Sequence, residues 1–78
     1  MHNITQCIIN ILSLELGIAT TKITPECHLI KDLDADSIDT VNIIATINTE
    51  FRIHLTMKQA EKINTVKELI KSVEKMLP

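Results

Sequence analysis

The apolar residues near the start of the chain repeat with the period of an α-helix. They fall at positions i, i+3, i+4, i+7 and i+8, which are Ile4, Cys7, Ile8, Ile11 and Leu12. This spacing gathers them on one stripe, the stripe that an amphipathic helix turns toward a core. The pattern stops at Leu16, and Gly17 follows as a C-terminal stop signal. The sequence therefore predicts a helix from about Asn3 to Leu16.

A second helical pattern covers residues 37–51 and has two apolar stripes instead of one. At about 100° per residue the stripes lie on opposite sides of the helix. They are Ile43, Ile44, Ile47 and Phe51 on one side and Ile38, Val41 and Ala45 on the other. One stripe can face the core. The other leaves two interpretations: the helix is buried on both faces, or it carries a small exposed strip, edged by Asp39 and Asn42, that docks partners.

Two helix-capping signals occur in the last third of the chain. Thr56 followed by Gln59 has the form of a capping box, which predicts a short helix at about 57–62. Thr65 and Glu68 repeat the signal and open a last helix that runs to about Met76. The predicted inner face of this last helix consists of Val66, Leu69, Ile70, Val73 and Leu77.

The connection at residues 18–35 is too apolar for a free linker. Its apolar residues predict packing onto the helices, and they are Ile18, Ile23, Leu29, Ile30 and Leu33. A cap at Thr24 followed by Pro25 predicts a brief helical turn at 24–26. No domain boundary, internal repeat or low-complexity tract is visible. The expected fold is therefore all-α: a single domain over residues 1–78, in which three main helices and one short helix form a small antiparallel bundle.

Composition supports helices joined by few loops. The chain has 78 residues, 45% of them hydrophobic, with one aromatic residue, Phe51, one glycine and two prolines. Cys7 and Cys27 are too few and too far apart for a disulfide framework, and we expect a core thiol and a loop thiol. Polar residues interrupt the apolar N-terminus, which predicts neither a signal peptide nor membrane insertion. The expected location is the cytoplasm.

Charge is distributed unevenly along the chain. Residues 32–50 hold five carboxylates and no base, whereas residues 51–78 hold six Lys or Arg against three Glu. The net charge of −2 hides this separation. A concentrated acidic patch attracts basic protein surfaces and repels nucleic acid, so we expect protein partners and no nucleic acid.

The candidate chemistry lies at the start of the second predicted helix. Ser37 is surrounded by the four aspartates of this segment, Asp32, Asp34, Asp36 and Asp39. Asp36 is a good N-cap residue, and Asp39 places negative charge in the first turn. Acidic neighbours and the lack of a nearby histidine make Ser37 a poor nucleophile, but a residue well placed for presentation to another protein. We therefore expect no catalytic residue in this chain.

The acidic segment fails as a calcium loop. An EF-hand needs glycine at its sixth position and glutamate at its twelfth, where this chain has Ser37 and Ile43. The histidines, His2, His28 and His54, are scattered without Cys or Glu at ligand spacing, and we expect surface or loop positions for them. The single glycine excludes a glycine-rich phosphate loop. No metal site is predicted.

Three segments resemble the acyl carrier proteins. They are DADSIDTV at residues 34–41, Glu50-Phe51 at the end of the following helix, and AEKINTV at residues 60–66. Their spacing also matches, and the resemblance runs from about Ile4 to Val73. It implies that a separate magnesium-dependent transferase moves 4′-phosphopantetheine from coenzyme A onto Ser37. The thiol of this arm would then carry acyl chains as thioesters, with Asp36 helping to position the serine and the metal of the transferase.

The resemblance also implies roles for two further groups of residues. Partner enzymes would contact Asp36, Ile38, Asp39, Val41, Asn42 and Ala45. The acyl chain would enter a cavity lined by Ile43, Ile44, Ile47, Phe51, Leu55, Ile63 and Leu69, although core packing explains these residues equally well. The expected function is a monomeric acyl carrier, not an enzyme, for fatty-acid, polyketide or lipid-modification synthesis. The alternative is a helical interaction module that keeps the fold without the arm.

The chain departs from the family pattern at several positions. Asp34 stands where the family usually has glycine, and Asn42, Asn48 and Thr49 replace expected carboxylates of the second helix. The last segment is rich in lysine. We expect docking to a generic synthase to be weaker and less sensitive to salt than that of a fully acidic carrier.

Overall fold

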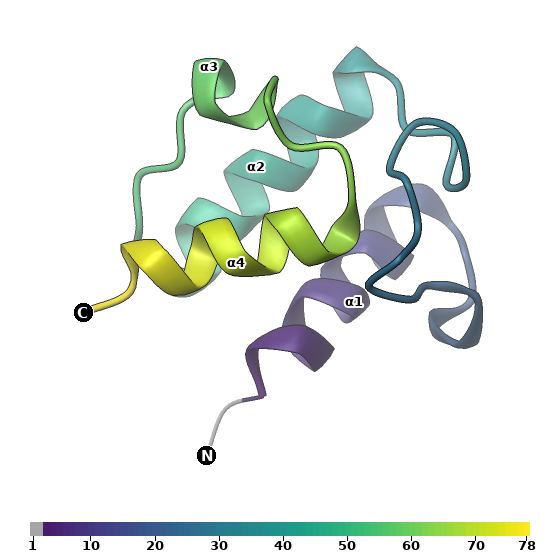
Figure 1. Ribbon diagram of the computed structural model, residues 1–78, viewed down its shortest axis with the longest axis horizontal. Helices are drawn as coiled ribbons and strands as arrows, with labels where there is room; N and C mark the ends of the chain where they lie inside the picture. Colours follow the sequence, from purple (N-terminus) through teal and green to yellow (C-terminus); the bar gives the residue numbers. More distant parts are fainter. Residues whose placement is uncertain (1–2) are drawn as a thin grey trace.

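The computed structural model describes residues 3–78, so the surface position expected for His2 lies outside the described residues. Its regular elements are all helical across this range (Figure 1). They are α1 (Ile4–Leu16), the 3-10 turn η1 (Thr20–Lys22), α2 (Ser37–Phe51), α3 (Met57–Ala60) and α4 (Val66–Met76). The predicted three main helices and one short helix are confirmed.

Helix α1 begins and ends where its sequence signals predict. The Asn3 side chain accepts a hydrogen bond from the backbone N–H of Gln6 at 3.1 Å. At the other end Gly17 adopts φ +66°, and its N–H donates to the carbonyl oxygen of Ser13 at 2.9 Å. Because this left-handed conformation costs little only for glycine, Gly17 ends the helix cleanly.

The other three α-helices each begin with a complete capping box. The pairs are Asp36 with Asp39, Thr56 with Gln59, and Thr65 with Glu68. Helix α3 ends at Ala60, two residues earlier than predicted. The N–H groups of Lys62 and Ile63 bond to carbonyl groups three residues back, at 3.2 and 3.0 Å, which tightens the chain out of α-helical geometry.

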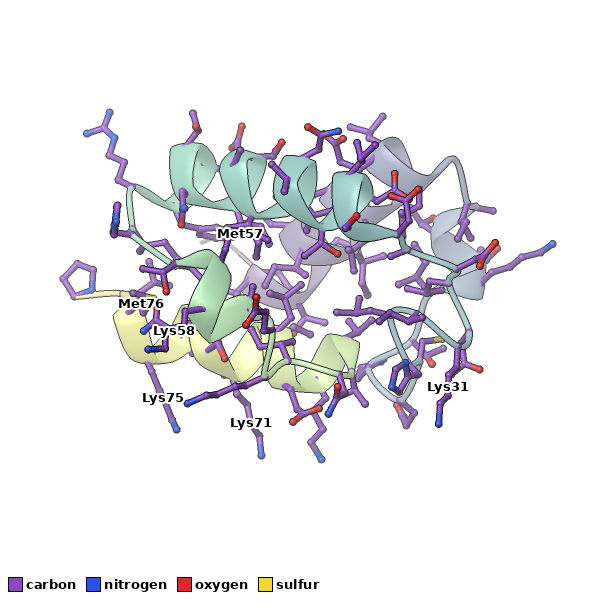
Figure 2. The ribbon with its side chains drawn as sticks, turned by 90° about the horizontal axis from the view of Figure 1, so that it is seen from above. Lys31, Met57, Lys58, Lys71, Lys75 and Met76 are labelled. Carbon is purple, nitrogen blue, oxygen red and sulfur yellow. The ribbon has the colours of Figure 1, made fainter. Side chains whose placement is uncertain are left out.

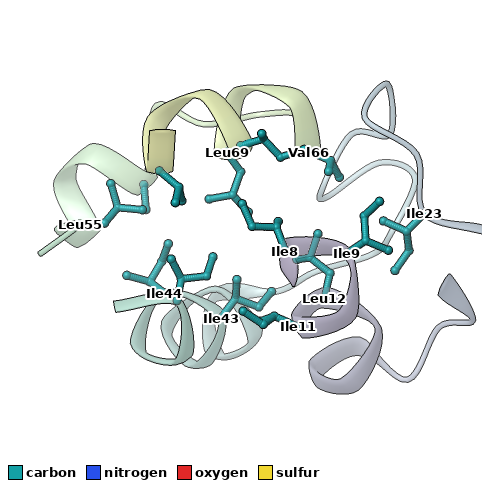
Figure 3. Packing of buried hydrophobic residues seen from close by; sticks show 14 of the residues in the cluster. Ile8, Ile9, Ile11, Leu12, Ile23, Ile43, Ile44, Leu55, Val66 and Leu69 are labelled. Atoms are coloured by element: carbon teal, nitrogen blue, oxygen red, sulfur yellow. The ribbon is translucent and has the colours of Figure 1, made fainter. Parts of the chain in front are cut away.

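The core lies between α1, α2 and α4 and is aliphatic (Figure 3). Its fully buried large side chains are Ile8, Leu12, Ile47, Leu69, Val66 and Val73. Phe51 and Leu77 pack against this core while half-buried. One apolar stripe from each of α1, α2 and α4 therefore meets in this core, which supplies most of the hydrophobic stabilisation.

The long connection before α2 is fastened to the start of α4. The N–H of Leu29 donates to the Asn64 carbonyl at 2.8 Å, and His28 and Thr65 form an isolated β-bridge. Packing of the connection onto the helices is thus confirmed for Ile23 and Leu33, which are buried, and for Ile18 and Leu29, which pack half-buried against the core. It is wrong for Ile30, which remains 63% exposed.

The brief helical turn predicted at 24–26 is a single hydrogen-bonded turn and not a helix. Pro25 instead occupies the second position of a turn that the Cys27 N–H closes onto the Thr24 carbonyl at 3.0 Å. Proline favours this position because its fixed φ suits both a β-turn and a first helical residue. The short 3-10 turn lies earlier, at Thr20–Lys22.

Candidate functional site

Ser37 is the first residue of α2, and its side chain is exposed. The backbone on both sides of it is held by reciprocal hydrogen bonds. Asp36 Oδ1 accepts from the Asp39 N–H at 2.8 Å, and Asp39 Oδ2 accepts from the Asp36 N–H at 3.1 Å. These bonds satisfy N–H groups at the helix start and place two carboxylates at its positive end. Ser37 is therefore exposed to solvent at a helix start that the capping box holds in place.

The chain reaches this helix start through a left-handed residue. Asp34 adopts φ +57°, a conformation that aspartate tolerates better than most residues. Its N–H donates to the Ile30 carbonyl at 3.0 Å, and the next N–H, of Ala35, donates to the Leu29 carbonyl at 3.0 Å. Ala35 is buried, with 5% exposure. The turn at Asp34 thus anchors Ala35 in the protein and directs the following residues outward.

Three of the four aspartates accept backbone hydrogen bonds through their side chains, in two separate places. Asp32 accepts the backbone N–H of His28 through Oδ2 at 2.6 Å, which closes the loop before the site. The Nδ1 atom of His28 in turn accepts N–H groups of Ile30 and Lys31 at 3.2 and 3.1 Å. Only Asp36 and Asp39 take part in the α2 capping box. Within residues 3–78, no three His, Cys, Asp or Glu side chains are grouped to hold a metal ion.

The two apolar stripes of α2 have different environments. Ile43, Ile44 and Ile47 are buried. On the other side Ile38 is 71% exposed and Val41 is 50% exposed, and Ala45 and Asn42 are also exposed. The exposure of this strip is therefore confirmed, and burial of both faces is wrong.

A cavity of about 620 Å³ extends from Ser37 between α2, α3 and the start of α4. Four residues of the predicted acyl cavity line it: Ile43, Ile44, Ile63 and Leu69. The other three do not. Ile47 is fully buried in the core, Phe51 packs half-buried against it, and Leu55 lines a separate groove. Ile47 and Phe51 lie about 15 and 21 Å along the helix from Ser37, beyond the reach of the cavity.

Sequence reasoning missed five of the nine apolar residues that line the cavity. The loop before α2 contributes Leu29, Ile30 and Ala35, and α3 contributes Met57 and Ala60. The signal for the loop residues was present, because a connection so rich in apolar residues needs something to pack against. Periodicity cannot predict which part of the protein such loop residues contact, so only the fold shows that they lie beside Ser37.

A half-buried asparagine fixes the connection between α2 and α3. Asn48 Nδ2 donates to the Leu55 carbonyl at 2.9 Å, and the Leu55 N–H donates to Asn48 Oδ1 at 2.8 Å. A carboxylate could accept the second bond but could not donate the first. The asparagine that replaces an expected carboxylate therefore has a structural role here.

Known proteins match almost the whole chain in sequence and in fold. The family model described as "Phosphopantetheine attachment site" matches residues 6–73. An acyl carrier protein of Buchnera aphidicola subsp. Baizongia pistaciae is 37% identical over 75 residues, which cover 96% of each chain. The solution structure of the apo doublet acyl carrier protein from prodigiosin biosynthesis superposes with a TM-score of 0.81 at 22% identity. That match covers 92% of this chain but 35% of the doublet, and it shows a shared fold.

Proposed function

The chain belongs to the phosphopantetheine attachment-site family of acyl carrier proteins, and from this premise we propose that Ser37 carries the 4′-phosphopantetheine arm. The protein is a carrier and not an enzyme. When bound, the covalent arm supplies a terminal thiol that holds acyl groups as thioesters. The observation that carries the assignment to Ser37 is its exposed hydroxyl, mounted by the Asp36–Asp39 capping box at the mouth of the apolar cavity.

The attachment step fits the chemistry of this helix start. Ser37 Oγ forms a bond to the phosphorus of the phosphopantetheinyl group, and the bond from that phosphorus to the nucleotide half of coenzyme A breaks. The serine proton passes to a base of the transferase, while one oxygen of Asp36 and one of Asp39 accept backbone N–H groups of the helix start. The chain contributes an accessible oxygen and a fixed acidic surface.

The working partners are a phosphopantetheinyl transferase and acyl-processing enzymes. We assign their docking surface to the exposed strip of Ile38, Val41 and Ala45, with Asp36, Asp39 and Asn42 at its edges. Apolar side chains bordered by carboxylates suit a basic partner surface with a shallow apolar centre. A monomeric carrier in the cytoplasm, serving fatty-acid or related synthesis, is part of the same proposal. No helix within residues 3–78 has the length and apolar character needed to cross a membrane.

In this proposal the acyl chain on the arm binds in the cavity beside Ser37. Its interior wall is aliphatic, with Ile43, Ile44, Ile63 and Leu69. An acyl chain that leaves water for this aliphatic wall gains about 0.8 kcal/mol for each CH₂ group buried. Nuclear Overhauser contacts between an octanoyl chain on the arm and the methyl groups of Ile44 or Ile63 support this role. An octanoyl chain without such contacts, seen only in solvent, contradicts it.

Mass spectrometry tests the attachment site directly. The chain is incubated with coenzyme A, magnesium and a phosphopantetheinyl transferase. We expect the mass to rise by one phosphopantetheinyl group in the native chain and in a Ser72→Ala control, whose hydroxyl lies on α4. We expect no rise in Ser37→Ala. Modification of Ser37→Ala places the arm elsewhere, and an unmodified native chain with several transferases favours the interaction module without an arm.

A further inference from the structure

The lysine-rich part of the chain forms a basic surface on the side away from α2. Lys58, Lys71 and Lys75 extend from α3 and α4 on this side, whereas α2 runs along the opposite edge of the molecule (Figure 2). Lys71 and Lys75 are separated by about 6 Å along α4, one helical turn. These lysines belong neither to the exposed strip of α2 nor to the lining of the cavity beside Ser37.

A groove of about 300 Å³ lies within the basic surface, between α3 and α4. Its floor is apolar and its edges are polar: it is lined by Leu55, Ile63 and Met76 with Gln59, Lys62, Glu68, Ser72 and Lys75. It shares only Ile63 with the cavity beside Ser37. The groove is therefore a second concave site with an apolar floor and two lysines at its edge.

Glu68, the one acidic residue that lines the groove, accepts hydrogen bonds from within the protein. Glu68 Oε1 accepts the N–H groups of Asn64 and Thr65 at 3.2 and 3.0 Å and the Thr65 hydroxyl at 3.2 Å. This carboxylate oxygen therefore serves the start of α4. Glu68 keeps its negative charge, but Lys62 and Lys75 outnumber it at the groove, so the lining residues together favour a negatively charged ligand.

We propose that the α3–α4 groove is a second docking site, which binds an acidic amphipathic helix of a partner protein. The apolar floor accepts one aliphatic side chain of that helix. Carboxylates one turn apart on the partner match the one-turn spacing of Lys71 and Lys75, with Lys62 on the facing edge. The site requires no arm on Ser37, so it stands independently of the attachment proposal.

The shape of the groove favours a protein helix over a lipid surface. Binding to a bilayer interface relies on apolar side chains that protrude. The large exposed apolar side chains within residues 3–78 are Leu14, Ile30, Ile38, Val41 and Met57, and none of them lines the groove. Leu55 at its floor is 3% exposed. A recessed apolar floor receives an inserted side chain, as a helix-in-groove contact does.

The test uses the unmodified chain and a synthetic helical peptide with one leucine face flanked by glutamates. We expect salt-sensitive binding, with amide shifts at Gln59, Lys62 and Ser72 in two-dimensional NMR spectra. The double variant Lys62→Glu/Lys75→Glu should weaken binding about tenfold. The control Lys22→Glu/Lys31→Glu makes the same change in net charge at two exposed residues outside the groove and should bind as the native chain does.

Three results overturn the proposal. Equal weakening by both double variants means that net charge alone attracts the peptide. Binding to phosphatidylglycerol vesicles that depends on Lys62 and Lys75, without peptide binding, assigns the surface to a membrane. Concentration-dependent shifts of the groove amides without peptide assign it to a second copy of the chain. Thermal melting of both double variants checks that each remains folded.

Discussion

Helices α2 and α4 begin in the same way but use their apolar residues differently. Each starts with a complete capping box. In α4 the buried residues form one stripe, and lysines such as Lys71 face solvent. In α2 Ile47 is fully buried, while Ile38 and Val41 on the other side are 71% and 50% exposed. Periodicity identifies apolar faces, but only the fold decides which face packs and which remains available to a partner.

The starting ends of the two helices differ as well. At α4 the carbonyl groups of Cys27 and Pro25 accept the N–H groups of Val66 and Lys67 at 3.0 and 2.8 Å. The loop therefore covers this end. At α2 the first residue, Ser37, is exposed. Another protein can reach a helix start only where the rest of the chain does not cover it. The loop covers the start of α4 but leaves Ser37 exposed, so of these two helix starts only that of α2 is accessible.

The largest expected effect separates the two faces of α2. Replacing Ile47 by alanine leaves a hole in the packed core and should lower the free energy of unfolding by about 2–5 kcal/mol. Val41→Ala removes an exposed side chain and should change it by no more than about 0.5 kcal/mol. Urea unfolding followed by circular dichroism measures both. Comparable losses in the two variants would mean that the strip around Val41 is covered after all.

A smaller effect distinguishes the two asparagines of α2. Asn48→Asp removes the N–H donor to the Leu55 carbonyl and places a carboxylate beside it, which should cost about 1–2 kcal/mol of unfolding free energy. Asn42→Asp introduces the same charge at an exposed position and should cost no more than about 0.5 kcal/mol. Hydrogen exchange at the Leu55 amide tests the two hydrogen bonds between Asn48 and Leu55 locally. Equal stability of the two variants would mean that these bonds do not stabilise the protein.

Local signals in the sequence predicted the helices well. Asn3 and Gly17 bound α1, and the capping boxes at Asp36, Thr56 and Thr65 start the other three helices. Such signals work because a cap is satisfied by residues three or four positions away. The 3-10 turn at Thr20–Lys22 carries no such cap signal and was not predicted, and the proline after Thr24 forms a single turn because proline after a cap residue starts a β-turn as readily as a helix.

The candidate site was predictable only in its local part. The position of Ser37 and its cap follow from the helix start, and the apolar stripe of Ile38 and Val41 follows from periodicity, but its exposure is known only from the fold. The cavity depends on which parts of the chain meet in space. Ile30 and Met57 contribute to its wall from segments without a long apolar period. No rule of spacing connects them to Ser37, so the structure was needed.

The smallest expected effect compares the closing ends of α2 and α4. Arg52 ends α2 at φ +53°, with its N–H bonded to the Asn48 carbonyl, whereas Leu77 ends α4 at φ −75°. A side chain in the left-handed region is strained, and glycine relieves this strain but also frees the unfolded chain. Arg52→Gly should therefore raise the free energy of unfolding by about 0.5 kcal/mol. Leu77→Gly removes a half-buried side chain from an ordinary conformation and should lower it. Thermal melts of the two variants in opposite directions support this difference, and a destabilised Arg52→Gly would mean that its side chain holds the helix end.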